Sequence, residues 1–169
     1  MKQAAFWKLS MGRGDFDDIL EVLEYLRQGL VLAHSQTRKL AFAQEAQGEQ
    51  FVHQDRDGDY FYLCHGNRTT THPRRGIILL GQFTGLSIPV RHHKWRNNDG
   101  WAGRPFLWIK TAISSKKLIG EYKQQWTPRN NSTFVKVPPK DLKLFESVIL
   151  KPYFGLTFSK LGLKRSSIS

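Results

Sequence analysis

Apolar and polar positions follow clear patterns along this chain, and these patterns predict its elements. Four short runs rich in apolar or aromatic residues, bounded by turn residues, are typical of strands: residues 6–10, 30–33, 59–65 and 76–83. Between the first two runs, apolar residues recur at intervals of three and four, which indicates one buried helical face (Phe16, Ile19, Leu20, Leu23 and Leu26). Asp15 is expected to cap this helix and Gly29 to end it.

The second half of the chain predicts two further elements. Residues 106–113 favour a strand in which Trp108, between Leu107 and Ile109, is expected to be part of the core. Pro138 and Pro139 predict the start of a last helix, which is expected to end at Pro152 and to bury three apolar residues (Leu142, Phe145 and Ile149). A short helix is also expected within residues 40–54.

The order of these elements is strand, helix, several strands and helix. It predicts an α+β domain in which a strongly bent mixed sheet or small barrel carries helices on its outside. The length of 169 residues suits one domain, which we expect to span residues 1–157, with the Ser- and Lys-rich residues 158–169 as a basic tail or linker. Cys64 is the single cysteine, so a reducing cytoplasm is expected. No apolar run is long enough to span a bilayer, and the first ten residues lack the apolar core of a signal peptide.

Charge is placed unevenly along the chain. The formal net charge is +12, and the sequence pI is about 10.0. Within residues 62–136, 13 lysines and arginines stand against 2 acidic residues, so this span carries +11 of the total. Such an excess predicts an anionic partner, most often nucleic acid, although a basic surface without a partner is the open alternative.

The most informative stretch is residues 92–110 (HHKWRNNDGWAGRPFLWIK), in which Trp95 and Trp101 stand six residues apart. The residues between these tryptophans fit neither a helical nor a strand period, so both are expected on a loop. Aromatic faces beside positive charge suit a nucleotide, and four cations lie close in sequence: Arg91, Lys94, Arg96 and Arg104. The alternative is that both indoles are core residues.

Signatures of catalysis are missing from the sequence. There is no P-loop, no dinucleotide-binding fingerprint, and neither a CxxC nor an HxxxH pair to accompany His65, His92 and His93. The basic half of the chain has too few carboxylates to hold magnesium. We therefore expect a binding domain that uses no metal or cofactor, rather than an enzyme.

The order of several segments is similar to a known family. Its segments follow one another as in the YTH and EVE domains, which are methylated-base readers of the PUA-like fold. These segments are FWKLS at 6–10, YLRQGLVLAHS at 25–35, GDYFYLCHG with RRGIILLGQFTG, WRNNDGWAGRPFLWIKTAISSKKL at 95–118 and VPPKDLKLFESVIL at 137–150. The resemblance covers about 150 residues. It implies a strongly bent sheet of the PUA-like type and an aromatic cage that holds a flipped or unpaired base.

The resemblance also implies roles for individual residues. Trp95 and Trp101 would be the cage walls, and Ser10 would contact the edge of the base. YTH domains place a further Trp on the second strand, where this chain has Val31 or Leu32, so that the cage would be completed by Tyr60 or Tyr62. Phosphate contacts are expected from eight cations: Lys8, Arg91, Lys94, Arg96, Arg104, Lys116, Lys117 and Arg129.

The opening FWKLSMG looks more like the N-terminal EVE-like readers of bacterial McrB-type restriction systems. This implies a specificity domain that reads a modified base in double-stranded DNA by base flipping. An AAA+ NTPase motor, C-terminal in a longer protein, and a separate nuclease subunit would then be its partners. Three alternatives stay open: an RNA reader of N6-methyladenine or another modified base, a small nuclease or RNA-modifying enzyme, and an interaction module that binds no nucleic acid.

Overall fold

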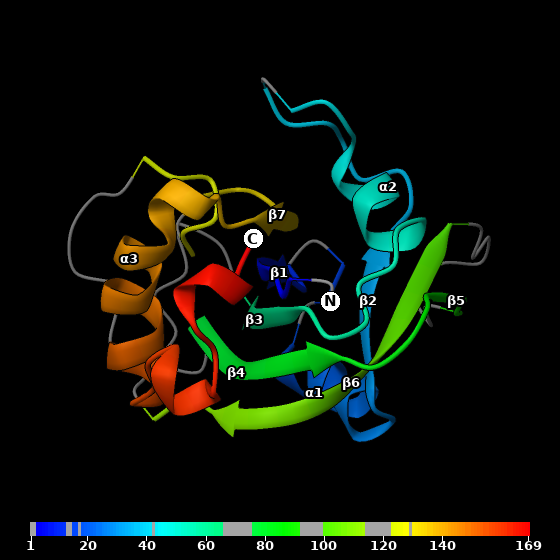
Figure 1. Ribbon diagram of the computed structural model, residues 1–169. Helices are drawn as coiled ribbons and strands as arrows, with labels where there is room; N and C mark the ends of the chain where they lie inside the picture. Colours follow the sequence, from blue (N-terminus) through cyan, green and yellow to red (C-terminus); the bar gives the residue numbers. More distant parts are fainter. Residues whose placement is uncertain are drawn as a thin grey trace.

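The computed structural model describes residues 3–12, 15–16, 18–41, 43–65, 76–91, 100–113, 123–128 and 130–169. The predicted α+β class is confirmed: one mixed sheet curls into a half-barrel, and few helices accompany it (Figure 1). Helix α3 and the C-terminal residues cover the outer face of the sheet, whereas α2 contacts β2 and β7, the two strands at its edges.

The strand order of the sheet is β2-β6-β4-β3-β1-β7. These strands are β2 (Leu30–His34), β6 (Trp101–Thr111), β4 (Gly76–Phe83), β3 (Tyr60–His65), β1 (Phe6–Ser10) and β7 (Phe134–Lys136), and a two-residue strand, β5 (Ile88–Pro89), pairs with β6. Strands β1 and β3 run parallel, and the other neighbours are antiparallel. Four of the predicted strands are thus confirmed within one or two residues.

Strand β6 is longer than the sequence predicted and changes its neighbour along its length. Its first part pairs with β2, with His34 opposite Trp101 and Leu30 opposite Pro105, and its second part pairs with β4. Trp101 therefore begins a strand, and the prediction that it lies on a loop is wrong. The sequence WAGRP hides this strand, because Gly, Arg and Pro remove the apolar-polar alternation by which half-buried strands are recognised.

The predicted first helix is α1 (Ile19–Arg27), and the short helix expected within residues 40–54 is α2 (Gln47–Val52). The cap of α1 is Asp18 rather than Asp15, because the Asp18 carboxylate accepts a hydrogen bond from the Leu20 N–H at 3.2 Å. The helix packs Val22 and Leu26 on the inner core, whereas the predicted core residue Leu20 is 61% exposed.

The closing helix consists of η1 (Pro139–Asp141), α3 (Leu142–Phe145) and the wider, π-type turn η2 (Glu146–Phe154). All three apolar residues predicted to face the core are buried. Pro152 lies inside η2 and does not end it; the helix ends at Gly155, whose φ is +63°. In an α-helix a proline ring clashes with the carbonyl four residues back, and the wider turn relieves this clash.

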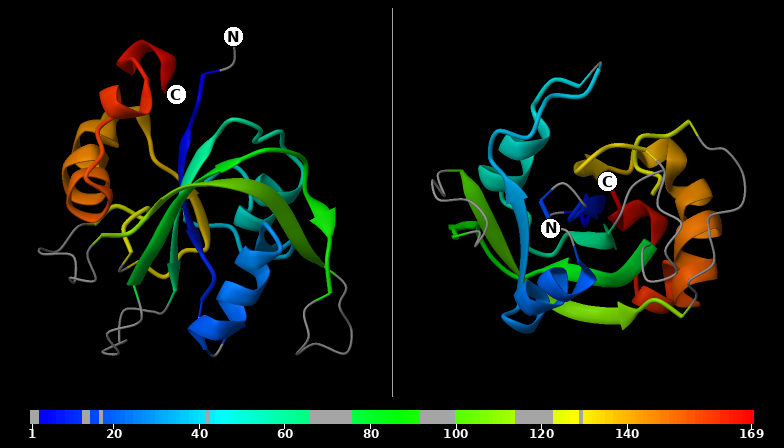
Figure 2. Two further views of the ribbon diagram at one scale, coloured as in Figure 1. Left: turned by 90° about the horizontal axis from the view of Figure 1, so that it is seen from below. Right: turned by 180° about the vertical axis from the view of Figure 1, so that it is seen from behind.

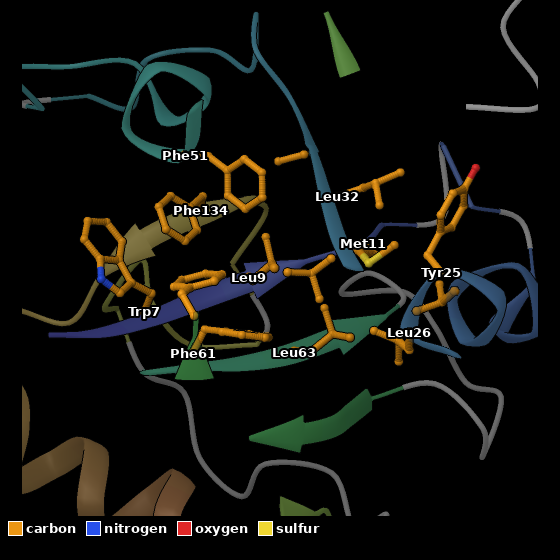
Figure 3. Packing of buried hydrophobic residues seen from close by; sticks show 14 of the residues in the cluster. Trp7, Leu9, Met11, Tyr25, Leu26, Leu32, Phe51, Phe61, Leu63 and Phe134 are labelled. Carbon is orange, nitrogen blue, oxygen red and sulfur yellow. The ribbon is translucent and has the colours of Figure 1, made fainter. Parts of the chain in front are cut away.

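Two hydrophobic cores lie on the two faces of the sheet. The inner core fills the half-barrel (Figure 3), where the Trp7 ring stacks on Phe134 with centroids 4.4 Å apart and Phe61 stacks on Phe83 at 4.5 Å. The outer core joins β1 and β3 to the C-terminal helix through Phe6, Tyr62 and other apolar residues.

The last twelve residues, predicted as a tail or linker, pack back onto the domain. Phe158 and Ile168 are buried in the outer core, and Leu161 of the short turn η3 (Ser159–Leu161) packs against it. A second short turn, η4 (Arg165–Ser167), precedes Ile168. The Ala4 N–H donates to Ser167 O at 3.1 Å, and the Ser169 N–H donates to Ala4 O at 3.0 Å. The two ends therefore lie side by side (Figure 2). Among the described residues, no helix has the length and apolarity needed to cross a membrane.

Candidate nucleic-acid interface

Aromatic side chains from four parts of the chain meet where β6 begins. The Trp101 ring lies edge-to-face against Phe16 at 5.7 Å and against His34 at 5.2 Å, and Phe16 lies edge-to-face against Tyr25 at 5.9 Å. Together with two residues on the adjoining strand ends, these side chains form what we call the rim cluster, defined as Met11, Phe16, Tyr25, His34, His65 and Trp101. The cluster joins the ends of β1, β2 and β3 to α1 and to the start of β6.

Hydrogen bonds hold the ends of β1 and β3 together at this cluster. The Met11 N–H donates to Cys64 O at 3.0 Å, and the His65 imidazole meets Met11 O at 2.7 Å through Nδ1. Because a carbonyl can only accept, Nδ1 of His65 carries the proton. The Gly12 carbonyl accepts from the Phe16 N–H at 3.0 Å, and the Phe16 ring lies against Trp101.

Gly100 brings the start of β6 close to the end of β2. Its φ is +108°, and a Cβ added there would lie 2.7 Å from His34 Cε1, so a larger residue would clash as well as being strained. Its carbonyl accepts from the Ser35 N–H at 2.6 Å. His34 Nδ1 accepts from the Gln36 N–H at 3.1 Å, which leaves the ring proton of a neutral His34 on Nε2.

Three basic segments of the chain begin and end beside the rim cluster. These segments are residues 13–14, 66–75 and 92–99, and their described neighbours include Gly12, His65 and Gly100. In sequence the three segments carry six cations against one acidic residue, Asp99: Arg13, Arg68, Arg74, Arg75, Lys94 and Arg96. At the border the Tyr25 hydroxyl donates to Arg91 O at 3.5 Å, and the Arg91 residue is exposed. The rim cluster is thus a largely buried aromatic group beside the exposed Arg91, at the points where three basic segments join the described chain.

The predicted base-binding residues are divided between the two faces of the sheet. Ser10 lies on the same face of β1 as Phe6, the face of the outer core, whereas Trp101 belongs to the inner core and is 6% exposed. The Tyr60 ring stacks on the Phe6 ring with centroids 5.1 Å apart, and the Tyr62 hydroxyl donates to Trp126 O. Both tyrosines therefore pack in the outer core. The structure therefore does not bring Ser10 or either tyrosine to Trp101.

Val31 and Leu32, the other predicted cage residues, are fully buried in the inner core and present no surface to a base. Trp95 lies outside the described residues, as do five of the predicted phosphate contacts (Lys94, Arg96, Lys116, Lys117 and Arg129). Of the predicted site, Trp101 and Arg91 are the residues that the structure places at the basic rim.

Two of the predicted phosphate contacts are buried cations with structural roles. Lys8 Nζ donates to Asn130 O at 2.6 Å and to Ser132 Oγ at 2.8 Å. Burial lowers the pKa of Lys8, and the nearby Cys64 thiol offsets this only in part. The expectation that Lys8 contacts phosphate is therefore corrected, because its ammonium group is enclosed by the protein. Lys8 lies two residues after the buried Phe6 and therefore on the same face of β1, a signal that could have indicated its burial.

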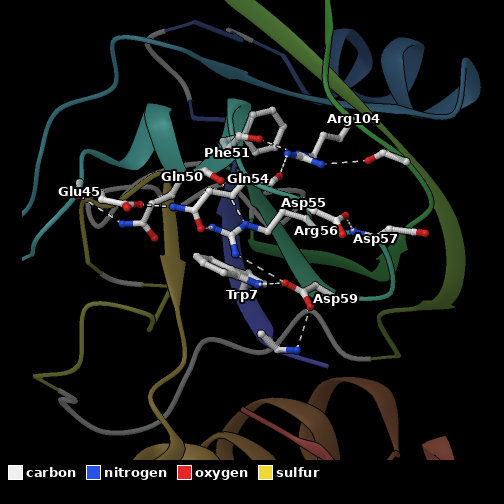
Figure 4. A network of polar contacts seen from close by, with 12 residues as sticks. Trp7, Glu45, Gln50, Phe51, Gln54, Asp55, Arg56, Asp57, Asp59 and Arg104 are labelled. Carbon is white, nitrogen blue, oxygen red and sulfur yellow. Dashed lines mark hydrogen bonds and ion pairs between the residues drawn. The ribbon is translucent and has the colours of Figure 1, made fainter. Parts of the chain in front are cut away.

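Arg104 is likewise enclosed (Figure 4). It donates to the carbonyls of Phe51 at 2.6 Å, Gly85 at 3.0 Å and Gln54, and burial lowers its pKa to about 10. Its guanidinium links the end of α2 to the connection that follows β4. The prediction that Arg104 contacts phosphate is therefore wrong, because its donors bind backbone carbonyls inside the protein. The neighbouring Arg56 lies 4.1 Å over the Trp7 ring, whose indole N–H donates to Asp59 at 2.9 Å.

Trp108 was expected in the core, but it is 41% exposed. Its indole N–H donates to Thr111 Oγ1 at 3.1 Å, and its ring lies 6.3 Å from Phe106. The β4 residue opposite is Gly81, which offers no side chain to cover it, and pairing with β2 has ended by Pro105. Sequence alone could not show that this part of β6 lacks a second neighbouring strand.

Comparison with known proteins adds little. No protein-family model and no curated protein matches this chain. A crystal structure of protein PSPTO5229 from Pseudomonas syringae is 16% identical over 65% of this chain and 71% of that chain, with a TM-score of 0.37. Among the described residues, no three His, Cys, Asp or Glu side chains gather in a group that could hold a metal ion.

Proposed function

We propose that this chain is a nucleic-acid-binding domain that reads a modified base in double-stranded DNA. The observation that carries the proposal is the rim cluster, where Trp101 lies edge-to-face against His34 near the exposed Arg91. Three segments that carry six cations and one carboxylate in sequence join the described chain at this cluster. Positive charge holds the phosphate backbone without regard to sequence, and aromatic surfaces hold bases.

The rim suits extraction of a base from the duplex. Flipping a base costs a few kcal/mol, and stacking on an aromatic side chain returns about 1–3 kcal/mol per base. A buried methyl group adds about 0.8 kcal/mol, so discrimination of a methylated base requires a closely fitting pocket. In this proposal Trp101 is the floor of that pocket and Trp95, from the adjoining segment, is its wall.

The finer proposal is that the curled sheet is a PUA-like domain of the EVE or YTH type. The domain would then be the specificity module of a McrB-type, modification-dependent restriction system in the cytoplasm. It would bind DNA without cleaving it, and an AAA+ motor and a separate nuclease would act on the bound DNA. This proposal rests on the order of sequence segments and on the basic aromatic rim.

A binding panel tests the proposal. The purified chain is titrated with labelled duplexes that contain an unmodified base, N6-methyladenine, 5-methylcytosine or 5-hydroxymethylcytosine, and with RNA of matched sequence. We expect one modified duplex to bind at least tenfold more tightly than the unmodified one, with affinity falling steeply as salt increases. Affinity that is absent at low salt, or that does not change with salt, contradicts a nucleic-acid partner.

One observation favours a second candidate, a reader of single-stranded RNA. Trp108 is exposed on β6 with Lys110 two residues further on, and such a pair is typical of surfaces on which unpaired bases stack. Replacing Trp108 with Ala distinguishes the two candidates. It is expected to weaken RNA binding by at least about fivefold if bases stack there, since one stacking contact contributes about 1–3 kcal/mol. It is expected to leave duplex binding unchanged if the rim is the site.

A further inference from the structure

Among the described residues, one side of strand β6 has no neighbouring strand along its second half. From Trp101 to Pro105 the strand pairs with β2, and this pairing ends at Leu30. From Phe106 onward β6 pairs with β4. Figure 1 shows this part of β6 at the border of the sheet, with β4 on one side of it and no labelled strand on the other. We call the unpaired side of residues 107–112 the open edge.

Trp108 directs its backbone groups to the open edge. In an antiparallel pair, the backbone groups of successive residues point alternately toward and away from the partner strand. The Phe83 N–H donates to Asp59 O at 2.9 Å, on the side away from β6. The preceding Gln82 and its opposite residue, Leu107, therefore bond across the pair of β4 and β6. It follows that the N–H and C=O of Trp108 point away from β4.

The second residue that faces the open edge is Thr111. The Ala112 N–H donates to Ile78 O at 2.9 Å, toward β4, so the residue before it points its backbone groups away from β4. Between Trp108 and Thr111 the register shifts, because Ile109 has no opposite residue in β4. Within the described part of the chain, neither Trp108 nor Thr111 has a backbone hydrogen-bond partner on this side.

Both ends of the open edge are closed by backbone carbonyls. The Phe106 N–H donates to Gly29 O at 3.2 Å, and the Ile113 N–H donates to Tyr153 O at 2.7 Å. The residues between these two points, 107–112, span about 20 Å when extended. The open edge therefore has room for a short extended segment and not for a long strand.

Apolar side chains are exposed along the open edge. Leu107 is 55% exposed and Trp108 is 41% exposed, and Ile113 at the closed end is 63% exposed. The Trp108 indole N–H donates to Thr111 Oγ1 at 3.1 Å, which holds the ring along the strand. Large apolar side chains that gather on one exposed segment are typical of an interaction surface.

Positive charge accompanies the open edge. Lys110 is exposed within it, and each carbonyl that closes an end comes two residues after an exposed cation: Arg27 before Gly29, and Lys151 before Tyr153. These charges disfavour a second copy of this chain as the added strand. Two such edges in an antiparallel pair would bring two Lys110 side chains together, and each chain carries a net charge of +12. A segment that carries carboxylates has the complementary charge.

We propose that the open edge of β6 binds an extended acidic peptide segment of another protein, which adds a strand to the sheet. The backbone of the segment bonds to the N–H and C=O groups of Trp108 and Thr111. Its apolar side chains cover Leu107 and Trp108, and its carboxylates pair with Lys110. Unpaired backbone groups in a row favour a peptide over RNA, which matches no strand register. The inference goes beyond the proposed DNA function and does not rest on it.

Synthetic peptides test the inference. The probe is a short labelled peptide in which glutamate alternates with valine, and its binding to the full chain is measured by fluorescence anisotropy. One control peptide has lysine in place of glutamate. A second control keeps every side chain of the probe but carries N-methyl groups on its backbone amides, which then cannot donate hydrogen bonds to β6.

Two substitutions at one position separate backbone from side chain. Thr111→Pro removes an N–H of the open edge, and an edge position tolerates proline because that N–H has no partner in the sheet. Thr111→Val keeps the N–H and is the matched control, since both changes remove the hydroxyl that accepts from the Trp108 indole. Lys110→Glu reverses the charge at the edge, and Lys143→Glu, at an exposed position of α3, is its matched control. Circular dichroism confirms that each variant is folded.

We expect the glutamate peptide to bind with a Kd below about 1 mM, and both control peptides to bind about tenfold or more weakly. Thr111→Pro is expected to weaken binding by about tenfold or more, and Thr111→Val by less than about twofold. Lys110→Glu is expected to weaken binding by about threefold or more, and Lys143→Glu to leave it unchanged. Hydrogen exchange of the Trp108 and Thr111 amides should slow when the peptide is bound.

Equal binding of the N-methylated peptide overturns the inference, because the backbone of the edge is then not used; this comparison decides even if Thr111→Pro does not fold. Equal binding by Thr111→Pro and Thr111→Val overturns it for the same reason. Absence of peptide binding at about 1 mM also overturns it.

Two other occupants of the edge are recognised by their own results, and each overturns the acidic segment. Self-association of the unaltered chain in analytical ultracentrifugation that Thr111→Pro abolishes identifies a second copy. Binding of single-stranded RNA that Trp108→Ala weakens, with no binding of peptide, identifies RNA. Duplex binding at the rim is measured separately and is expected to be the same for Thr111→Pro and Thr111→Val, so failure of this inference leaves the proposed function in place.

Discussion

The hydroxyl of Ser10 and the indole of Trp101 lie on opposite faces of the curled sheet. Ser10 shares one face of β1 with Phe6 and Lys8, the face of the outer core, whereas Trp101 packs in the inner core with Phe16. A single pocket cannot be lined by both side chains without a change in the register of β1. The proposed site is therefore built on the inner side, at the rim cluster.

Trp101 supports the fold as well as the proposed site, so its replacement must separate the two effects. Trp101→Ala removes a buried ring that contacts Phe16 and His34 and is expected to lower the free energy of unfolding by about 3–5 kcal/mol. Trp101→Phe keeps an aromatic core and is expected to remain folded at 25 °C while losing preference for the modified base. Denaturant unfolding and the binding panel measure the two quantities; unchanged base preference in a folded Trp101→Phe would exclude this indole from the site.

Arg104 and Arg91 should respond to substitution in opposite ways. Arg104→Met removes the donors to three backbone carbonyls and is expected to cost about 3 kcal/mol or more in unfolding free energy, because buried acceptors are left unsatisfied. Arg91→Ala, at an exposed position, is expected to leave stability within about 0.5 kcal/mol. In binding experiments Arg91→Ala should weaken modified and unmodified DNA equally. If Arg104→Met is as stable as the unaltered protein but binds DNA more weakly, Arg104 contacts DNA after all.

Lys8 predicts a specific dependence of stability on pH. Because burial lowers its pKa in the folded state below the ordinary value of 10.5, the unfolded chain binds this proton more tightly. Burial of the charged Lys8 therefore lowers the free energy of unfolding at neutral pH. This penalty decreases as the pH rises from the lowered pKa of the folded state toward 10.5.

Lys8→Met is the matching comparison, because Tyr62 and Cys64, whose pKa values are raised by burial, are present in both proteins. Across pH 7 to 10, the unfolding free energy of the unaltered protein should increase relative to that of Lys8→Met. A difference between the two proteins that does not change with pH would show that Lys8 retains its ordinary pKa in the fold.

The C-terminal twelve residues should behave as part of the domain. Phe158 packs edge-to-face on Phe6 at 5.1 Å, and its N–H donates to the Glu146 carboxylate at 2.8 Å. Phe158→Ala is expected to lower the unfolding free energy by about 3–5 kcal/mol. Leu161→Ala, in the same segment but only partly buried, is expected to cost less and serves as the matched control. Equal, small effects of both changes on thermal melting would show that the segment is a detachable tail.

The sequence alone determined the α+β class, four of the strands, the first helix and the basic span, because each follows from local periodicity and composition. The run Phe6–Ser10 alternates as a strand must, and the apolar spacing from Phe16 to Leu26 suits a helix whatever the rest of the chain does. What local patterns could not determine is which strands become neighbours and how the sheet curls.

Those two properties decided the site. Trp101 became a strand residue because β2 pairs with it, and Trp108 became exposed because the same pairing ends at Pro105. Lys8 and Arg104 are cations in sequence, yet distant backbone groups at Asn130 and Phe51 enclose them and satisfy their donors. A charged side chain is buried only when such partners are brought to it, and partners more than 50 residues away are supplied by tertiary structure alone.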